Sequence, residues 1–366
     1  MNAVALLETA RALPKVLLHE HLDGGLRVTT LWELLQQRGI APPAADVGRL
    51  AAWFDANAHA GSLEKYLDGF GLTVAAMASP AALERVSFEA AEDARSDGAV
   101  LAEFRIAPLL FEAHAISGEA AVEAILAGLA RSPLPLLRQS GLIVCAMRHL
   151  GPEESLRAAR LALRYQGRGV VGFDLAGPEF GFPATAHAQA LALVRDAGLA
   201  LTLHAGEADA AERVLEAGRL GARRIGHGVR LVDALSTPAG AALIEEARAL
   251  DLHLEVCPTS NVHTGAAASV ASHPITALWR AGISLSYHTD NRLMSCTSHS
   301  EEAAALLRDT PLQASDLVAM ARQAAQHSFL DADARARALI AIDAAIDAAI
   351  NPTINAASKA AINTAV

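Results

Sequence analysis

Two histidines separated by one residue stand near the start of the chain. His19 and His21 lie in the run KVLLHEHL at residues 15–22, which has the apolar character of a buried β-strand. Alternate residues of a strand point to the same face, so both imidazoles would face one side, as ligands of one metal ion must. The pair alone is equally compatible with two packed or solvated histidines. A metal site therefore requires further ligands from elsewhere in the chain.

Three later apolar runs end in residues that bind metals or transfer protons. They are LHAGE at 203–207, GHG at 226–228 and HTDN at 288–291. Taken singly, these residues are more often packed histidines, helix-capping carboxylates or turn formers. Three histidines and one aspartate brought together, however, form a ligand set for Zn²⁺ that leaves one coordination position open for water. We therefore predict a zinc site.

Two residues beside this site have the chemistry of an acid and a base. Bound zinc lowers the pKa of its water to about 7, and the reaction then needs proton donors and acceptors nearby. Glu207, three residues beyond His204, can reach a substrate without being a ligand. His227, one strand onward, can hold the water or take its proton. The alternative for Glu207 is a carboxylate in the first turn of a helix, where the helix dipole favours it.

Short apolar runs that alternate with helical segments must position these residues. The runs are 15–22, 100–108, 142–150, 170–177, 200–207, 224–231, 253–261 and 283–291. Nearly continuous apolar strands separated by helices, such as those expected at 184–197 and 212–220, predict a parallel sheet. Eight repeats predict a single closed (β/α)₈ TIM-type barrel, whose catalytic groups lie at the carboxyl ends of its strands.

The interval after the first strand is too long for one crossover. We predict one barrel domain over residues 1–350, with a helical insertion at about 23–99, extra C-terminal helices and a tail at 351–366. Ser298 and Glu301 resemble a capping box that opens one of these later helices. In the insertion, Leu63, Tyr66, Leu67 and Phe70 follow a helical spacing. Spacing alone favours ordinary burial of this stripe.

Composition narrows the class of protein. Of 366 residues, 52% are hydrophobic and 19% are charged, which excludes a disordered chain. The net charge of −10 argues against a nucleic-acid or anionic membrane partner. Three cysteines without CxxC spacing, no secretory leader and no apolar run near 18 residues lead us to expect a soluble cytoplasmic enzyme. The oligomeric state is left open.

The distribution of lysine decides between one metal ion and two. Binuclear metallohydrolases on similar barrels commonly bridge their metals through a modified lysine near the end of a middle strand. Residues 66–358 contain no lysine, Lys15 begins the first strand, and Lys65 lies in the insertion. We therefore expect one zinc ion per subunit rather than a binuclear amidohydrolase site.

Together, the motifs resemble the adenosine deaminase family over residues 13–345. They are PKVLLHEHLDG at 14–24, SLEKYL at 62–67, VVGFDLAGPE at 170–179, HAGE at 204–207, GHG at 226–228, CPTSN at 257–261 and TDN at 289–291. The resemblance implies zinc-dependent hydrolytic deamination of adenosine and 2′-deoxyadenosine to inosine and 2′-deoxyinosine plus ammonia, in purine salvage. The implied partner is a small purine nucleoside.

The resemblance also implies roles for particular residues. The zinc ligands would be His19, His21, His204 and Asp290. Glu207 would protonate purine N1, and His227 would orient the zinc-bound water and act as base. The backbone of Gly177 would meet purine N3, and Asp23 would bind the ribose 5′-hydroxyl. Leu63, Tyr66, Leu67 and Phe70 would form an apolar gate over the nucleoside, which reverses the reading from spacing alone.

Two positions depart from the commoner family pattern. Asn291 stands where a second aspartate is usual, and an amide donates to purine N7 without needing a raised pKa. His288 stands where asparagine is usual, and strand alternation places it on the same face as Asp290. It is either a partner of a metal ligand or a packed interior histidine. Glu255 and Asp174 are buried carboxylates that either orient a metal histidine or satisfy backbone donors.

Other activities compete with this interpretation. One is deamination of another 6-aminopurine, such as adenine, AMP or a modified adenosine. Asp23 favours a nucleoside, because adenine- and AMP-specific relatives usually carry glutamate there, and no cluster of Lys and Arg suits a phosphate. The other is a non-catalytic purine-binding protein, which would have lost a metal ligand or the acid, whereas this chain retains all of them.

Overall fold

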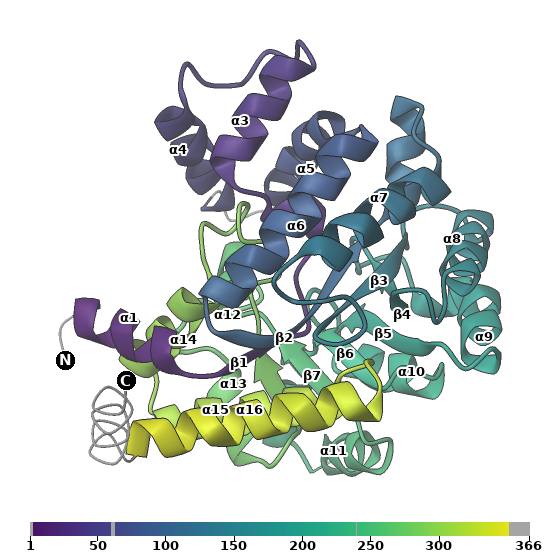
Figure 1. Ribbon diagram of the computed structural model, residues 1–366. Helices are drawn as coiled ribbons and strands as arrows, with labels where there is room; N and C mark the ends of the chain where they lie inside the picture. Colours follow the sequence, from purple (N-terminus) through teal and green to yellow (C-terminus); the bar gives the residue numbers. More distant parts are fainter. Residues whose placement is uncertain (1–2, 60–62, 239, 351–366) are drawn as a thin grey trace.

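The computed structural model describes residues 3–59, 63–238 and 240–350; the side chains of residues 3, 63–68 and 347–350 lie outside this description. Eight parallel strands pair in the order β1 to β8. Their bounds are β1 (Lys15–Leu17), β2 (Ala99–Ile106), β3 (Ser140–Met147), β4 (Val170–Ala176), β5 (Ala200–Ala205), β6 (Arg224–His227), β7 (His253–Val256) and β8 (Leu285–Tyr287). The curled sheet is surrounded by helices (Figure 1), as predicted for a TIM-type barrel.

Helices occupy most of the chain between the strands. Before β2 lie α1 (Ala3–Ala12), α2 (Leu22–Gly25), α3 (Val28–Gln37), α4 (Val47–Ala58), α5 (Leu63–Met77) and α6 (Pro80–Ser96). The barrel helices are η1 (Pro108–His114), α7 (Gly118–Arg131), α8 (Pro152–Arg164), η2 (Ala184–His187), α9 (Ala188–Asp196), α10 (Glu212–Arg219), η3 (Val229–Ser236), α11 (Gly240–Ala249), α12 (Pro258–His263) and α13 (Ile275–Arg280). Three C-terminal helices follow β8: α14 (His299–Asp309), α15 (Ala314–His327) and α16 (Ala332–Ile350).

The predicted insertion and late helices are present. Helices α2 to α6 fill the predicted interval, and α3 to α6 project above the barrel in Figure 1. The Ser298 hydroxyl accepts the backbone N–H of Glu301, so the predicted N-cap of α14 is formed. Residues 351–366, the predicted tail, lie outside the described residues.

The predicted strands run too far at their carboxyl ends. The first ends at Leu17 rather than at residue 22, and the last ends at Tyr287 rather than at residue 291. Beyond Leu17 the chain bends through isolated bridges, Glu20 with Asp290 and His21 with Arg105. The backbone groups of these segments bond to residues that are distant in the sequence, and a sequence pattern does not register such pairing.

The same segments join the last strand to the first. Single hydrogen bonds connect them: Asp290 N–H donates to His19 O (3.0 Å), and His21 N–H donates to Asp290 O (2.8 Å). The N–H of Leu18 donates to the Nδ1 atom of His288 (3.2 Å), so a side chain replaces a backbone acceptor at this seam. Barrel closure therefore depends on the residues that carry the predicted metal ligands.

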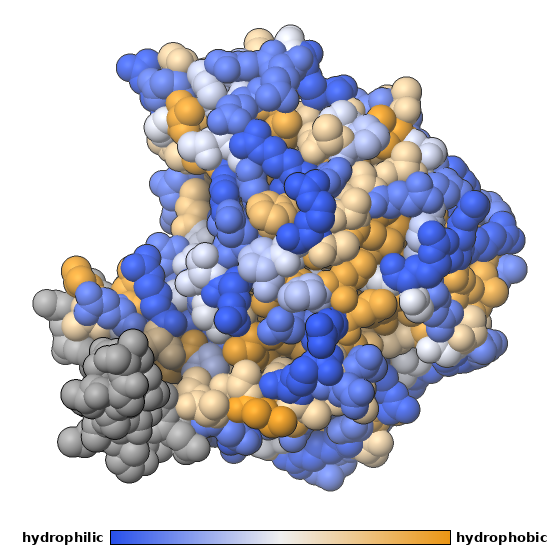
Figure 2. All heavy atoms as spheres, viewed as in Figure 1, coloured by the Kyte–Doolittle hydropathy of each residue, from blue (hydrophilic) through white to orange (hydrophobic). Residues whose placement is uncertain are grey.

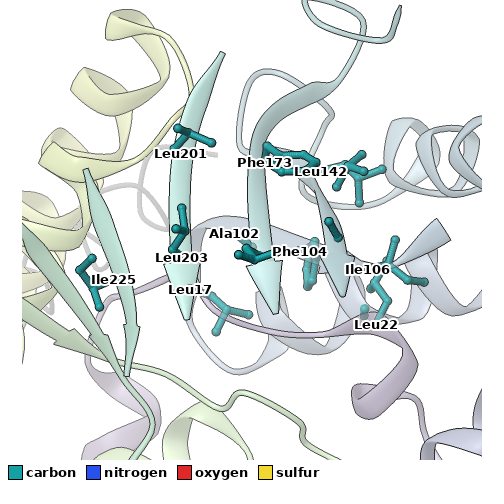
Figure 3. Close-up of a cluster of buried hydrophobic side chains, with 14 of the residues drawn as sticks. Leu17, Leu22, Ala102, Phe104, Ile106, Leu142, Phe173, Leu201, Leu203 and Ile225 are labelled. Atoms are coloured by element: carbon teal, nitrogen blue, oxygen red, sulfur yellow. The ribbon is translucent and has the colours of Figure 1, made fainter. Parts of the chain in front are cut away.

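The strands separate a hydrophobic layer from a charged interior. In β2, Ala102, Phe104 and Ile106 alternate with Glu103 and Arg105, and all five are buried. Figure 3 shows the first set packed with aliphatic and aromatic side chains of neighbouring strands. Because alternate residues face opposite sides, Glu103 and Arg105 point into the barrel, where side chains fill the space.

The C-terminal helices close one end of the barrel. Helix α15 packs on β8 and β1, and α16 packs on α15 and β2. The Phe329 ring, between these helices, lies 3.6 Å from the guanidinium of Arg224. On the face drawn in Figure 2, hydrophilic side chains cover most helices, and hydrophobic ones gather between α16 and the helices above it. Among described residues, no single helix is long and apolar enough to span a membrane; η1 and α7 meet that test only as a bent pair.

Removing the side-chain acceptor at the seam should destabilise the fold. In His288→Leu, the buried N–H of Leu18 loses its partner, which should lower the free energy of unfolding by about 1–3 kcal/mol. Urea unfolding measures this change. His114→Leu, at a partly exposed position in η1, is the control and should change stability by less than about 0.5 kcal/mol. Equal stability of the two variants would contradict the role of His288.

Candidate active site

Four predicted metal ligands converge at the carboxyl ends of the strands. The Nε2 atoms of His21 and His204 are 3.2 Å apart. Asp290 Oδ1 lies 3.3 Å from Nε2 of His19 and 3.6 Å from Nε2 of His21. Two ligands of one ion lie farther apart than the length of a bond from the ion to either of them, and each of these distances meets that condition. All four atoms can therefore surround one ion. The other oxygen of Asp290 accepts the hydroxyl of Ser260 at 2.6 Å, which fixes the direction of Oδ1.

His227 faces the same space from β6. Ligating atoms of His19, His204, His227 and Asp290 all lie within 4.8 Å of one another, while His21 forms a second such group with Asp174 and His204. The His227 Nε2 atom lies 3.5 Å from Glu207 Oε2. His227 therefore stands between the metal-ligating group and the predicted acid.

Two buried carboxylates face the opposite nitrogens of the ligand histidines. Glu255 Oε2 lies 3.0 Å from His19 Nδ1, and Asp174 Oδ2 lies 3.0 Å from His204 Nδ1. A carboxylate at Nδ1 favours the proton there and leaves the Nε2 lone pair free for a metal. The contacts fit the predicted orienting role of both carboxylates.

His288 has different contacts. Its Nδ1 accepts from Leu18, and its Nε2 lies 2.7 Å from the hydroxyl of Ser286. Among the described residues, these hydrogen bonds include none to a predicted metal ligand. The alternative of a packed interior histidine is therefore the better description, since strand alternation placed it on the right face but not at the metal.

Two interior arginines connect the carboxylates. Arg105 binds Asp174 through Nη1 (2.8 Å) and Glu255 through Nη2 (2.5 Å). Arg224 binds Glu255 through Nε (2.5 Å) and Glu103 through Nη1 (2.7 Å). We call this five-residue set, Glu103–Arg224–Glu255–Arg105–Asp174, the interior ion chain. All five side chains have no solvent exposure.

The ion chain sets the ionisation of the site. Burial alone would raise the pKa of Asp174 and of Glu255. His204 and Arg105 outweigh burial at Asp174, and the two arginines outweigh it at Glu255, so both pKa values lie below their usual range.

The ligand histidines suit a metal ion. Burial lowers the pKa of His21, which favours the neutral imidazole that binds metals. The Nε2 atom of His19 is buried and makes no hydrogen bond within the described part of the chain. A metal ion fits this donor set and would give Nε2 of His19 a partner.

Backbone conformation aims two of these side chains. His227 and Asp290 have φ values of 63° and 58°, in the left-handed region that residues other than glycine seldom adopt. Gly226 precedes His227, and a Cβ atom there would lie 3.0 Å from the His19 ring and 3.2 Å from His204. The GHG motif thus lets three imidazoles approach one another.

Glu207 is held by its surroundings on two sides. Its Oε1 accepts from Thr264 Oγ1 (2.8 Å) and Asn261 Nδ2 (3.3 Å). The carboxylate of Glu179, which is 5% exposed, accepts the backbone N–H groups of residues 206–209 at 2.6, 3.0, 2.9 and 3.2 Å. Glu179 therefore shapes the loop that carries Glu207.

A cavity of about 310 Å³ adjoins these groups. It is within the size range of small-molecule sites. Its described lining includes His21, His204, Glu207, His227 and Asp290 together with the predicted substrate residues Asp23, Gly177, Asn291 and Phe70. The backbone of Leu63, Tyr66 and Leu67 belongs to α5, but their side chains lie outside the described residues.

Three predicted substrate residues have distinctive surroundings. Burial raises the pKa of Asp23 to about 7, and its Oδ1 has no hydrogen bond among the described residues. Gly177 has φ of 94°, and a Cβ atom there would lie 3.0 Å from Nδ1 of His149. A Cβ atom on Gly24 would come within 2.0 Å of Asn291 Oδ1, so only glycine at position 24 fits against Asn291.

Sequence reasoning missed several residues of the site. The run CPTSN was noted as a motif, yet Ser260 and Asn261 were given no role although they contact Asp290 and Glu207. Glu179 stands in the motif GPE, which marked it without indicating its function. The one sequence signal for Arg105 is that a charged residue stands inside an apolar strand. Such a position is uncommon and could have identified it. Met147 and His149, which line the cavity, had no such signal.

Comparisons with known proteins agree with this geometry. A sequence model described as adenosine deaminase matches residues 14–345. The chain is 42% identical over 350 residues to the adenosine deaminase of Mycobacterium tuberculosis (strain ATCC 25618 / H37Rv), covering 92% of this chain and 94% of that protein.

Solved structures share the fold. The Arabidopsis N6-mAMP deaminase superposes with a TM-score of 0.79 and 25% identity, covering 92% of this chain and 99% of that chain. An adenine deaminase from Arthrobacter aurescens superposes with a TM-score of 0.81 and 20% identity, covering 92% and 99%. Their substrates differ from each other, so the shared barrel alone does not select a substrate.

Weakening a carboxylate behind a ligand histidine should weaken metal binding. In Asp174→Asn, the amide no longer stabilises the His204 tautomer with Nε2 free, and Zn²⁺ affinity should fall by about 10- to 100-fold. Competition with a chromogenic chelator measures the affinity. Glu89→Gln, a buried carboxylate in α6 that contacts Thr30 and Arg85, is the control and should leave affinity unchanged. The same affinity for both variants would refute the orienting role.

Proposed function

Because the chain belongs to the adenosine deaminase family, we propose that it hydrolyses adenosine and 2′-deoxyadenosine to inosine and 2′-deoxyinosine plus ammonia. The observation that carries this proposal is the meeting of four potential ligands, a carboxylate and a histidine at one small cavity. We further propose one Zn²⁺ per chain, since nitrogen and carboxylate donors in this number suit zinc.

The charge of the cavity supports a nucleoside over a nucleotide. Among its described lining residues there is no Lys or Arg, whereas Asp23, Glu179, Glu207 and Asp290 all contribute carboxyl groups. A 5′-phosphate would face these groups without a cationic partner, which is costly in a partly enclosed site. The neutral ribose hydroxyl, in contrast, can donate to a carboxylate such as Asp23.

In the proposed mechanism, His19, His21, His204 and Asp290 would hold the zinc, and the chemistry that it would supply is activation of the water that attacks purine C6. Glu207 donates a proton to purine N1, which makes C6 electrophilic. His227, 3.5 Å from Glu207, lies where it can orient the attacking water. The hydrogen bond from Thr264 and the loop that Glu179 binds through its backbone N–H groups hold Glu207 in place for this proton transfer.

Other residues of the cavity would bind the nucleoside. We assign the backbone of Gly177 to purine N3, the amide of Asn291 to N7 and Asp23 to the 5′-hydroxyl, with Phe70 on the apolar wall. An amide at position 291 donates to N7 at any pH, because it does not titrate. Purine salvage in the cytoplasm is the proposed setting, which the three unpaired cysteines support.

A substrate panel tests the reaction and its scope. Adenosine, 2′-deoxyadenosine, adenine and AMP are compared by loss of the adenine absorbance band, with zinc content measured on the same sample. We expect kcat/KM for adenosine to exceed that for AMP by at least about 100-fold, because the phosphate has no cationic partner in the cavity. A preference for AMP or adenine would overturn the substrate assignment, and two ions per chain would overturn the mononuclear site.

A variant of the acid separates catalysis from metal binding. Glu207→Gln keeps the shape of the side chain but cannot deliver a proton, so kcat for adenosine should fall by at least about 100-fold while bound zinc stays constant. Glu112→Gln in η1 is a surface control that should retain full activity. Undiminished turnover in Glu207→Gln would remove this residue from the mechanism and favour a different proton donor.

A further inference from the structure

A line of hydrogen bonds runs from a backbone amide of α13 to the active site. Ile275 N–H donates to Nδ1 of His273 at 3.0 Å. Nε2 of His273 lies 3.3 Å from Oδ1 of Asn261, and Nδ2 of Asn261 lies 3.0 Å from Nδ1 of His227. We propose that His273 and Asn261 are positioning residues that fix the tautomer of His227, so that His227 presents an N–H group to the attacking water.

The direction of each bond follows from its fixed end. A backbone N–H can only donate, so Nδ1 of His273 must accept and its proton must lie on Nε2. That Nε2–H then donates to Asn261, which places the amide oxygen of Asn261 toward His273. Burial of His273, which is 4% exposed, lowers its pKa to about 3 and agrees with the neutral form required here.

A second contact gives the same orientation of the amide. Asn261 Nδ2 also lies 3.3 Å from Oε1 of Glu207, an oxygen that accepts from Thr264 Oγ1 as well, so an amide oxygen in this place would face it without a donor. Both constraints therefore turn the amide nitrogen of Asn261, a side chain with no solvent exposure, toward the active site. The amide nitrogen donates one hydrogen to His227 and the other to Glu207. No rotation of the amide satisfies these partners as well.

The consequence concerns the chemistry of His227. Since its Nδ1 accepts from Asn261, the proton of neutral His227 lies on Nε2, the atom that faces Glu207 Oε2 at 3.5 Å. In this tautomer the Nε2 atom of His227 donates a hydrogen bond and has no lone pair with which to take a proton from water. The family resemblance led us to expect a base at this position; the hydrogen bonds instead favour orientation of the water and stabilisation of its developing negative charge. The proton of the water would then pass to the carboxylate of Glu207 that remains after purine N1 is protonated.

Neither positioning residue lines the cavity described above. Asn261 lies on α12, directly after β7, and His273 lies in the segment before α13. They act on His227 and Glu207 through hydrogen bonds rather than on substrate. This inference rests on the proposed deaminase reaction for its catalytic meaning, but the arrangement of protons is independent of it.

The tautomer can be observed directly. Long-range ¹H–¹⁵N spectra of the zinc-loaded, ¹⁵N-histidine-labelled chain distinguish Nε2–H from Nδ1–H imidazoles, and the His227→Gln variant assigns the His227 signals. We expect an Nε2–H imidazole in the native protein. In Asn261→Asp, the carboxylate in place of the amide should draw a proton onto Nδ1 of His227. An Nδ1–H imidazole in the native protein, or no change in Asn261→Asp, would overturn the proposal.

Variants of His273 connect the tautomer to turnover. His273→Phe removes the donor that orients Asn261, so His227 should populate both tautomers and kcat should fall by about 10-fold with little change in KM. His273→Gln restores a donor and should recover most of the loss. The matched control is His187, a buried histidine hydrogen-bonded to Ser155 and to Arg148 O: His187→Phe should leave both the His227 signals and kcat unchanged in the protein that remains folded.

The outcomes separate this inference from the proposed reaction. A tautomer change without a change in kcat, or a loss of kcat without a tautomer change, would each overturn the positioning role. If the native chain fails to deaminate adenosine, the proposed function fails, whereas the spectra of Asn261→Asp still decide whether the hydrogen-bond line sets the tautomer.

Discussion

The arrangement of the site depends on charge pairing inside the barrel. Asp174 and Glu255 each face a ligand histidine, and both are buried. A single carboxylate without a partner would be protonated in such surroundings and would then favour a different imidazole tautomer. Arg105 lies between them and Arg224 binds the second, so the interior ion chain keeps both acids ionised. Loss of one partner from a buried pair costs about 3–5 kcal/mol, which makes this set structural as well as functional.

The ends of the strands both close the barrel and carry the candidate metal ligands. The residues that join β8 to β1 are also those that carry the candidate ligands, since the backbone of Asp290 bonds to both His19 and His21. The left-handed backbone of His227 and Asp290 turns their side chains inward where a regular strand would have continued. Such strain persists because surrounding bonds over-determine it, here the Ser260 hydroxyl at Asp290 and the Asn261 amide at His227.

Sequence patterns predicted the barrel and the ligand candidates because both follow local rules. Apolar runs at regular intervals identify strands, and unusual polar residues at their ends identify a site. Strand ends were predicted poorly, since the segment after Leu17 bends and forms bridges with residues such as Asp290, which lies far away in the sequence. The same reason hid Arg105: its partners Asp174 and Glu255 lie 69 and 150 residues away. The hydrogen bonds of Asn261 likewise join it to His227 and Glu207, which lie 34 and 54 residues away.

We propose that one zinc ion is held by three imidazoles and one carboxylate whose directions are set by the interior ion chain. Anomalous diffraction at the zinc edge from crystals of the zinc-loaded protein tests this most directly. We expect one anomalous peak per chain, bonded to Nε2 of His19, His21 and His204 and to Asp290, with Nδ1 of His19 and His204 still facing Glu255 and Asp174. Two peaks, or an ion bound through Nδ1 of these histidines, would contradict it.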